Sequence, residues 1–189
     1  TMAVIADKCP DININVVDLN QNRIEDWNNN DFSKLPIFEP GLDKIIKRCR
    51  NKNLFFTTNV EEQISLADMI FISVNTPTKT RGIGAGKAVD LKWVESSARQ
   101  ISKYAQGETI VIEKSTLPVK TAETIKKILL SDKNDSEKKF FVLSNPEFLA
   151  EGSAIENLEN PDRVLIGGED KNSINALKNI YLNWVPSTK

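Results

Sequence analysis

Two carboxylates, Glu147 and Glu151, stand four residues apart in the stretch SNPEFLAEGS, which begins at Ser144. An apolar run over residues 140–143 precedes them and predicts a buried strand that ends before Pro146. Ligands of open α/β sheets bind in the crevice outside the carboxyl ends of the strands. The two acids are therefore placed for acid–base chemistry, although a strand-to-helix turn with acids at the helix N-terminus would produce the same pattern.

The chain contains no histidine, which excludes Ser-His and Cys-His hydrolase chemistry and argues against a zinc site. Its two cysteines, Cys9 and Cys49, lack metal-ligand spacing and are interpreted as reduced core thiols. Any general base must therefore be Glu, Asp or Lys, and no metal is predicted.

The composition is that of an ordinary globular domain. Hydrophobic residues make up 40% of the 189 residues and charged residues 27%, which predicts about one domain. With 25 basic and 26 acidic side chains the net charge is −1, so nothing marks a nucleic acid or an anionic membrane as a partner. No apolar run approaches the roughly 20 residues of a membrane span.

Strand and helix patterns alternate along the chain. Strands are predicted over residues 13–19, 54–57, 69–74, 109–113, 140–143 and 163–166, the last closed by Gly167 and Gly168. Helices are predicted over residues 1–8, from about 20, over 41–50 and 60–66, from about 90, from 118 and over 174–184. The run 69–74 is apolar throughout, as in a parallel strand covered on both faces. The alternation predicts an α/β, Rossmann-like fold with a doubly wound, mostly parallel sheet.

Asp18 ends the first predicted strand and directly precedes a helix. In dinucleotide-binding folds an acid at this point bonds the ribose hydroxyls and favours NAD over NADP, because it repels a 2′-phosphate. Arg23, one helical turn further on, is placed to lie over the adenosine. A helix-capping role would explain Asp18 equally well.

Polar residues also follow two other predicted strands, in the segments VNTPT (74–78) and KSTL (114–117). Their backbone N–H groups and hydroxyls can line a cofactor crevice or orient a water molecule. The stretch Gly82-Ile-Gly-Ala-Gly86-Lys87 looks like a phosphate-binding loop, but it follows polar residues and has neither GxGxxG nor P-loop spacing. We interpret it as part of a mobile surface loop.

Four motifs together resemble one protein family. FISVNTPTKT (71–80), EKSTLPV (113–119), SNPEFLAEGSAI (144–155) and NPDRVLIGG (160–168) are similar to the animal-type UDP-glucose 6-dehydrogenases of the UDP-glucose/GDP-mannose dehydrogenase family, and the resemblance extends to LPIFEPGLDKI (35–45). These enzymes oxidise UDP-glucose to UDP-glucuronate and pass two hydrides to two NAD⁺. A cysteine thiol holds the intermediate as a thioester, which divides the oxidation into accessible steps.

The resemblance implies a role for each matching residue. Glu147 resembles the acid that assists thioester hydrolysis, and Thr116 the hydroxyl that positions the hydrolytic water. Asp18 and Arg23 resemble adenosine-ribose contacts. The further implied NAD contacts are Val74, Asn75, Thr76, Pro77, Thr78, Leu117 and Glu151, and the implied sugar contacts are Glu147, Phe148, Leu149, Ala150 and Glu151.

The chain also departs from the family pattern. Family members begin with a strand and GxGxxG, and continue into a central helix, a loop with the nucleophilic cysteine and a UDP-binding domain. We therefore expect residues 1–189 to be a truncated NAD-binding domain, inactive alone, in which neither Cys9 nor Cys49 is the nucleophile. The lost strand belongs between the strands that end at Asp18 and Val74, and its loss would leave backbone groups unpaired.

Two alternatives stay open. One is a dehydrogenase for another nucleotide sugar, such as a UDP-N-acetylhexosamine or GDP-mannose. The other is a short non-catalytic protein that modulates assembly of the intact enzyme, because residues 78–90 resemble a region used in oligomer contacts. For the full-length enzyme the resemblance implies UDP-glucose as substrate, a homo-oligomer and a cytoplasmic location.

Overall fold

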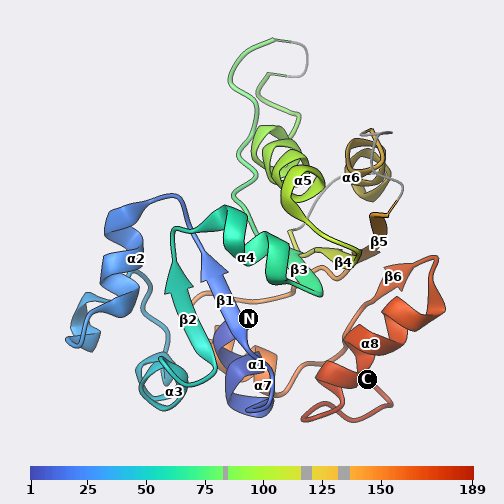
Figure 1. Cartoon of the computed structure of the whole chain (residues 1–189). Helices are drawn as coiled ribbons and strands as arrows, with labels where there is room; N and C mark the ends of the chain where they lie inside the picture. Colours follow the sequence, from blue (N-terminus) through green and yellow to red (C-terminus); the bar gives the residue numbers. More distant parts are fainter. Residues whose placement is uncertain (83–84, 116–120, 132–136) are drawn as a thin grey trace. The chain divides into compact units, whose positions relative to one another are not determined.

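The structure, a computed structural model, describes residues 1–82, 85–115, 121–131 and 137–189, which form two compact units (Figure 1). Unit 1 is drawn from residues 1–63, 148–164 and 176–189, and unit 2 from residues 64–147 and 165–175. The chain passes between the units at four points, two of which lie within helices α4 (Val60–Leu66) and α8 (Lys171–Tyr181). Among the described residues, no helix has the length and apolarity needed to cross a membrane.

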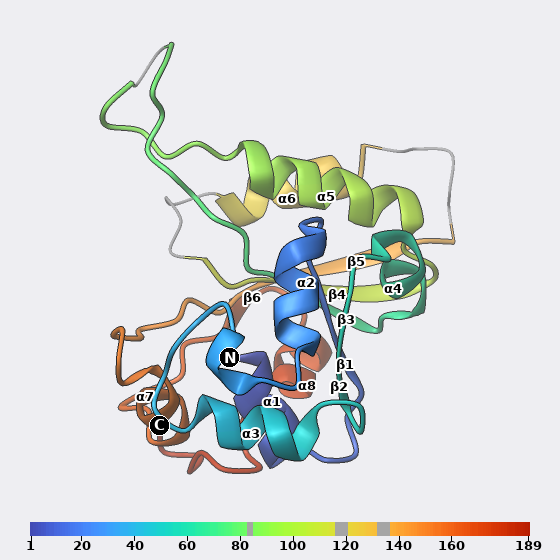
Figure 2. The same ribbon diagram turned by 90° about the vertical axis from the view of Figure 1, so that its left-hand side faces the viewer.

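Unit 1 contains a parallel pair of strands, β1 (Ile14–Val17) and β2 (Leu54–Thr57), aligned so that Ile14 lies opposite Leu54. Its other elements are α1 (Met2–Lys8), α2 (Gln21–Asn28), a short 3-10 helix (Phe32–Lys34), α3 (Leu42–Cys49) and α7 (Ala154–Glu159). Helix α1 packs against α3 and both strands, as both ribbon views show (Figures 1 and 2).

The core of unit 1 forms where α1 meets α3. Val4 and Ile46 are fully buried there, and Leu42, Ile45 and Cys49 are nearly so. The spacing of the four apolar residues in α3 predicted this buried face, and that prediction is confirmed.

Unit 2 contains four strands in the order β3 (Met69–Ile72), β4 (Glu108–Glu113), β5 (Lys139–Ser144) and β6 (Gly167–Gly168). The first three are parallel, and β6 runs antiparallel to β5. Helices α5 (Lys92–Tyr104) and α6 (Thr121–Leu129) pack side by side (Figure 2). The fully buried side chains of unit 2 include Ala98, Val111, Ile112, Ile125 and Leu143.

The predicted α/β class with parallel strands is confirmed, but the expected single sheet is present as two hydrogen-bonded sheets. Among the described residues, β1 pairs only with β2, and β3 pairs only with β4. The strands that end near Asp18 and Val74 therefore each lie at a sheet edge. The expectation that a further strand belongs between them stays a prediction.

Two details of the predicted strands are wrong. Residues 163–166 form no strand. The segment that pairs with β5 is Gly167–Gly168. The chain approaches β5 so closely at Gly168 that a larger residue would collide with Leu143. The strand predicted over 69–74 ends at Ile72, and Met69, Ile70 and Phe71 are half-buried rather than covered on both faces. An edge strand with one partner explains that exposure.

The close approach of β6 predicts a strong effect of Gly168→Ala. A Cβ at Gly168 would lie 2.3 Å from Cδ2 of the fully buried Leu143, so we expect a loss of about 1–3 kcal/mol in the free energy of unfolding. Gly167→Ala is the matched control, since its nearest neighbour, Cβ of Ser144, is 3.9 Å away. Urea unfolding measures both, and equal midpoints for the two variants would contradict the packing described.

Candidate functional site

Asp18 lies directly after β1 and is not the cap of the following helix. The N-cap of α2 is Asn20, whose side chain accepts a hydrogen bond from the backbone N of Arg23 at 3.2 Å. One oxygen of Asp18 accepts from the backbone N of Asn20 at 2.9 Å, and the other lies 3.4 Å from the Arg23 guanidinium. The carboxylate is about one-third exposed. An exposed pair of this kind contributes little stability and leaves Asp18 accessible to a ligand.

In unit 2, five residues at the carboxyl ends of β4 and β5 form one connected group, which we call the β4–β5 rim: Glu113, Lys114, Ser144, Asn145 and Glu147. The parallel register places Glu113 opposite Ser144, whose hydroxyl donates to Glu113 Oε2 at 3.2 Å. Glu113 is 4% exposed, and its Oε1 has no partner among the described residues. Burial raises the pKa of Glu113, against the opposing effects of the Ser144 hydrogen bond and the Lys114 charge.

Lys114 is the other buried charge of the rim, with only 3% of its side chain exposed. Its ammonium donates to Asn145 Oδ1 at 3.2 Å and lies 3.8 Å from Glu147 Oε2. Burial lowers the pKa of Lys114, and the carboxylates of Glu147 and Glu113 oppose that shift. The rim therefore places a one-third-exposed carboxylate, Glu147, beside a desolvated cation.

The segment that follows β3 is hydrogen-bonded to the segment that follows β4. The Ser115 hydroxyl donates to the backbone O of Val74 at 3.2 Å. This contact joins the segment that contains Asn75, Thr76, Pro77 and Thr78 to the end of β4. Thr116 and Leu117, expected to position a water and contact NAD, lie outside the described residues.

Residues 77–82 and 85–90, which we call the arm, include the stretch interpreted from the sequence as part of a mobile surface loop, and its mobility stays a prediction. Thr78 and Val89 form an antiparallel bridge, and backbone N of Lys79 donates to the O of Ala88 at 2.7 Å. Gly86 turns with φ at 75°, which favours glycine, and its N donates back to Lys79 O at 2.8 Å. The arm is thus a hydrogen-bonded hairpin that projects beyond α5 (Figure 1).

The predicted sugar-contact segment, Phe148, Leu149, Ala150 and Glu151, belongs to unit 1. The Arg163 guanidinium lies 5.1 Å above the half-exposed Phe148 ring, and Asn157 Oδ1 accepts from the backbone N of Ala150 at 3.1 Å. Helix α7 begins only at Ala154, so Glu147 and Glu151 do not lie in the first turn of a helix. That alternative interpretation of the two acids is wrong.

Glu39 supplies the carboxylate at the start of α7, a role that the sequence analysis missed. Its two oxygens accept from the backbone N of Gly152 at 3.0 Å and of Ala154 at 3.1 Å. Gly152 has φ at 82°, which a glycine adopts without strain. Glu39 lies in the motif LPIFEPGLDKI, which is the only signal in the sequence that singled out this region.

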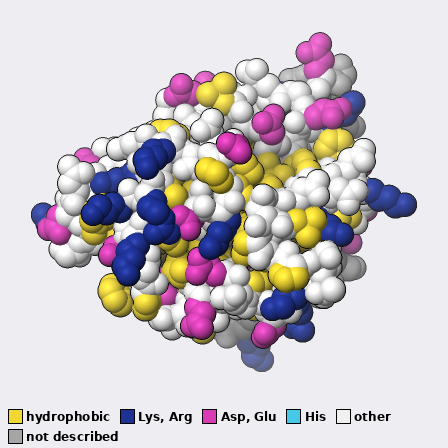
Figure 3. Space-filling model, turned by 90° about the horizontal axis from the view of Figure 1, so that it is seen from below, with side chains coloured by type: hydrophobic (Ala, Val, Ile, Leu, Met, Phe, Trp, Pro, Cys, Tyr) yellow, Lys and Arg dark blue, Asp and Glu magenta, His cyan; other side chains and the backbone are white. Residues whose placement is uncertain are grey.

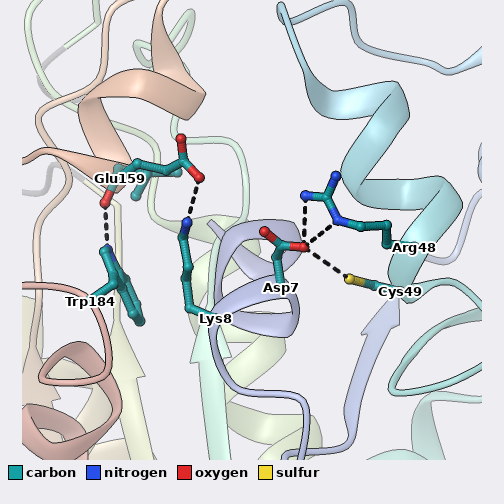
Figure 4. A network of polar contacts seen from close by, with 7 residues as sticks. Asp7, Lys8, Arg48, Cys49, Glu159 and Trp184 are labelled. Atoms are coloured by element: carbon teal, nitrogen blue, oxygen red, sulfur yellow. Dashed lines mark hydrogen bonds and ion pairs between the residues drawn. The ribbon is translucent and has the colours of Figure 1, made fainter.

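The two cysteines are buried and free, as predicted for core thiols. Burial raises the pKa of both thiols, so neither is an activated nucleophile. Figure 4 shows one carboxylate oxygen of Asp7 in contact with both Arg48, at 2.8 Å, and Cys49, at 3.8 Å. In the same view Lys8 of α1 pairs with Glu159 of α7 at 2.7 Å.

Within the described residues no group of three or more His, Cys, Asp or Glu could hold a metal ion.

The predicted site residues thus fall into separate groups. Asp18 and Arg23 lie together in unit 1, and the segment 148–151 is held in the same unit by Glu39 and Asn157. Val74–Thr78 and Glu147 belong to unit 2, where Glu147 is the exposed member of the β4–β5 rim. Glu113 was not predicted as a site residue, and Lys114 was named only as part of the segment 114–117, without a role of its own.

Comparison with known proteins places this arrangement in a family. Residues 1–185 match the model of the NAD binding domain of the UDP-glucose/GDP-mannose dehydrogenase family. The chain belongs to this family. As a family member it is 57% identical over 190 residues to UDP-glucose 6-dehydrogenase 2 of Arabidopsis thaliana, a match that covers 98% of this chain and 38% of that protein. It is 56% identical over 193 residues to UDP-glucose 6-dehydrogenase 5 of Oryza sativa subsp. japonica, covering 100% and 39%.

Solved structures show the same fold. A UDP-glucose dehydrogenase from the archaeon Pyrobaculum islandicum superposes with a TM-score of 0.83 at 29% identity, covering 97% of this chain and 41% of that one. A GDP-mannose dehydrogenase from Pseudomonas aeruginosa gives 0.80 at 25% identity, covering 96% and 41%. The chain therefore spans about two fifths of the length of the relatives it matches.

The contacts of Glu39 predict a local effect of Glu39→Ala. Without the carboxylate, two backbone N–H groups lose their acceptor, so amide exchange at Gly152 and Ala154 is expected to become about tenfold faster or more. The control is Glu25→Ala, which removes a side-chain bond to Gln21 on the exposed face of α2. Hydrogen exchange followed by NMR is the measurement. Unchanged exchange at both amides in Glu39→Ala would show that the cap is absent in solution.

Burial of Glu113 predicts a pH-dependent gain in stability for Glu113→Gln. The folded pKa lies above the usual 4.5, so the favourable contribution of this carboxyl is present at lower pH and is lost as the pH rises through the folded pKa. Gln keeps an acceptor for Ser144 without the charge, so the variant is expected to unfold at higher urea than the unmodified chain at pH 8, with the difference shrinking toward pH 4.

The matched control for that experiment is Glu108→Gln at the exposed start of the same strand, where the pair with Lys139 is 61% and 63% exposed. Its effect on stability is expected to be small at both pH values, because water screens the exposed pair. A Glu113→Gln variant that is less stable than the unmodified chain at pH 8 would contradict the desolvation described for Glu113.

Proposed function

We propose that this chain supplies the NAD-binding part of a UDP-glucose 6-dehydrogenase, which oxidises UDP-glucose to UDP-glucuronate with two NAD⁺. The observation that carries the proposal is 57% identity to an enzyme of that name over 98% of the chain. Identity to the GDP-mannose dehydrogenase is 25% and to the archaeal UDP-glucose dehydrogenase 29%, so the proposal of glucose as the sugar rests on the 57% relative. We propose the animal type within this family because the four motifs resemble it; plant relatives share more than half of the residues of this chain.

Asp18 and Arg23 are proposed to hold the adenosine ribose. The support is that Asn20, not Asp18, caps α2, so the Asp18 carboxylate stays accessible at the end of β1 and fits a pair of ribose hydroxyls. Further NAD contacts are proposed for Val74, Asn75, Thr76, Pro77, Thr78, Leu117 and Glu151. When bound, NAD⁺ supplies the hydride acceptor.

Glu147 and Thr116 are proposed as the catalytic residues of this part of the enzyme. Glu147 would take the proton of the water that hydrolyses the thioester, and Thr116 would orient that water. The support for Glu147 is its place at the end of β5, one-third exposed and beside a buried ammonium. Glu147, Phe148, Leu149, Ala150 and Glu151 are the proposed sugar contacts. The thiol is assigned to a residue other than Cys9 or Cys49, which are buried.

The complete enzyme is proposed to add a strand with a glycine-rich loop, a central helix and a UDP-binding domain to residues 1–189. The open edges of β1 and β3 support the added strand.

A cytoplasmic homo-oligomer is proposed for that enzyme, and the hydrogen-bonded arm favours a role in subunit contacts. The same arm supports the second candidate, a short non-catalytic protein that modulates assembly of the intact dehydrogenase. Nucleic acid is not a proposed partner, because the net charge of the chain is −1. On the face seen in Figure 3 several Lys and Arg side chains gather on the left, with Asp and Glu side chains among them.

The first prediction of this proposal concerns the chain alone. Without the thiol and the glycine-rich loop, the 189-residue polypeptide is expected to form no NADH from UDP-glucose and NAD⁺, followed by absorbance at about 340 nm. A chimera in which this sequence replaces its aligned 38% of the Arabidopsis enzyme is expected to form NADH. In that chimera Glu147→Gln should lower kcat by about 10²–10⁴-fold.

Three results would count against the proposal. Turnover by the 189-residue chain alone would contradict the truncated-domain assignment. A folded chimera that binds NAD⁺ and oxidises GDP-mannose in preference to UDP-glucose would contradict the sugar. Full turnover in the Glu147→Gln chimera would contradict the role of Glu147.

A further inference from the structure

We propose that Lys114 is a positioning residue that holds the Glu147 carboxylate in place at the carboxyl end of β5. The inference rests on the proposed function only in taking Glu147 as a group that acts on the reacting water. Nothing in the sequence motif distinguishes Lys114 from a surface lysine; its place in the fold does.

The backbone on which Lys114 stands is fixed from both sides. Its N donates to the O of Ile72 in β3 at 3.1 Å, and the N of Asn145 donates to the O of Glu113 at 2.9 Å. Hydrogen bonds among three neighbouring strands thus fix the position of the Lys114 backbone. Since β4 and β5 are parallel and in register, Lys114 and Asn145 leave the sheet at the same level.

Asn145 joins the lysine to the turn that carries Glu147. Its Oδ1 accepts from the Lys114 ammonium, while its Nδ2 donates to the O of Leu165 at 2.8 Å. With 1% of its surface exposed, Asn145 cannot rotate without breaking both bonds. The ammonium is therefore held toward Glu147, 3.8 Å away.

Burial distinguishes this pair from the other lysine–glutamate pair on the same two strands. Lys139 and Glu108 lie at the opposite ends of β5 and β4, at 2.7 Å, but both are more than half exposed. Water screens that pair, so it orders neither side chain strongly. Lys114 is 3% exposed and must keep anionic or polar partners: Glu147, Asn145 and the charge of Glu113.

The asymmetry of exposure suits a positioning role. Lys114 is buried, whereas Glu147 is 33% exposed, so the carboxylate is held from the protein side and remains open to solvent or a ligand on the other.

Titration in the 189-residue chain tests the contact without altering Lys114. We expect Glu147→Gln to lower the Lys114 pKa further, measured by NMR of the lysine ammonium groups, because Glu147 is the largest factor that raises it. Glu108→Gln is the control: it should lower the pKa of Lys139 and leave that of Lys114 unchanged. A Lys114 pKa that does not respond to Glu147→Gln would overturn the proposal.

Kinetics of the chimera test the function. Lys114→Met, which suits a buried position, is expected to lower kcat at least tenfold while KM for UDP-glucose and Kd for NAD⁺ change less than threefold. Lys114→Arg should recover part of kcat, and Lys139→Met should match the unmodified chimera. The double variant Lys114→Met/Glu147→Gln should be no slower than Glu147→Gln alone, because the lysine acts through Glu147.

The outcomes separate the two proposals. Loss of turnover in Glu147→Gln with unchanged kcat in a folded Lys114→Met defeats the role of Lys114 and leaves that of Glu147 intact. Effects of Lys114→Met that multiply those of Glu147→Gln would likewise overturn the positioning role. Full turnover in Glu147→Gln defeats the role of Glu147 itself.

Discussion

The parallel register of β4 on β5 is the constraint on which the candidate site of unit 2 depends. Six successive residue pairs, from Glu108 with Lys139 to Glu113 with Ser144, align the two strands. The chain that follows each strand then leaves at the same level, which brings Lys114 beside Asn145. A slip of one residue would turn every side chain of a strand to the opposite face and separate the members of the rim.

The rim is costly to the fold, which is why its composition is informative. A buried carboxyl with an oxygen that lacks a partner among the described residues, next to a buried ammonium, opposes folding. The fully buried Val111, Ile112 and Leu143 on the same strands offset that cost. Sites that break the rules of local stability in this way are typical of places where function has set the residue types.

The sequence predicted what local periodicity determines. The apolar spacing in α3 gave its buried face, and the bounds of β2 and α4 were predicted to the residue. It did not predict contacts between distant segments. The bonds of Glu39 to the start of α7 join residues more than a hundred positions apart, and the approach of Gly168 to Leu143 depends on how β6 meets β5. The burial of Lys114 likewise depends on neighbouring strands and has no signature in the motif EKSTLPV.

The central claim is that the end of β1 binds the adenosine ribose of NAD and that the β4–β5 rim acts on the nucleotide sugar. An experimental structure of the chimera with NAD⁺ and UDP-glucose bound tests it most directly. The account predicts Asp18 at the adenosine ribose, and Glu147, still paired with Lys114, beside the sugar C6. A structure in which Asp18, Asn75, Thr116 and Glu147 lie on different sides of the molecule, away from both ligands, would contradict it.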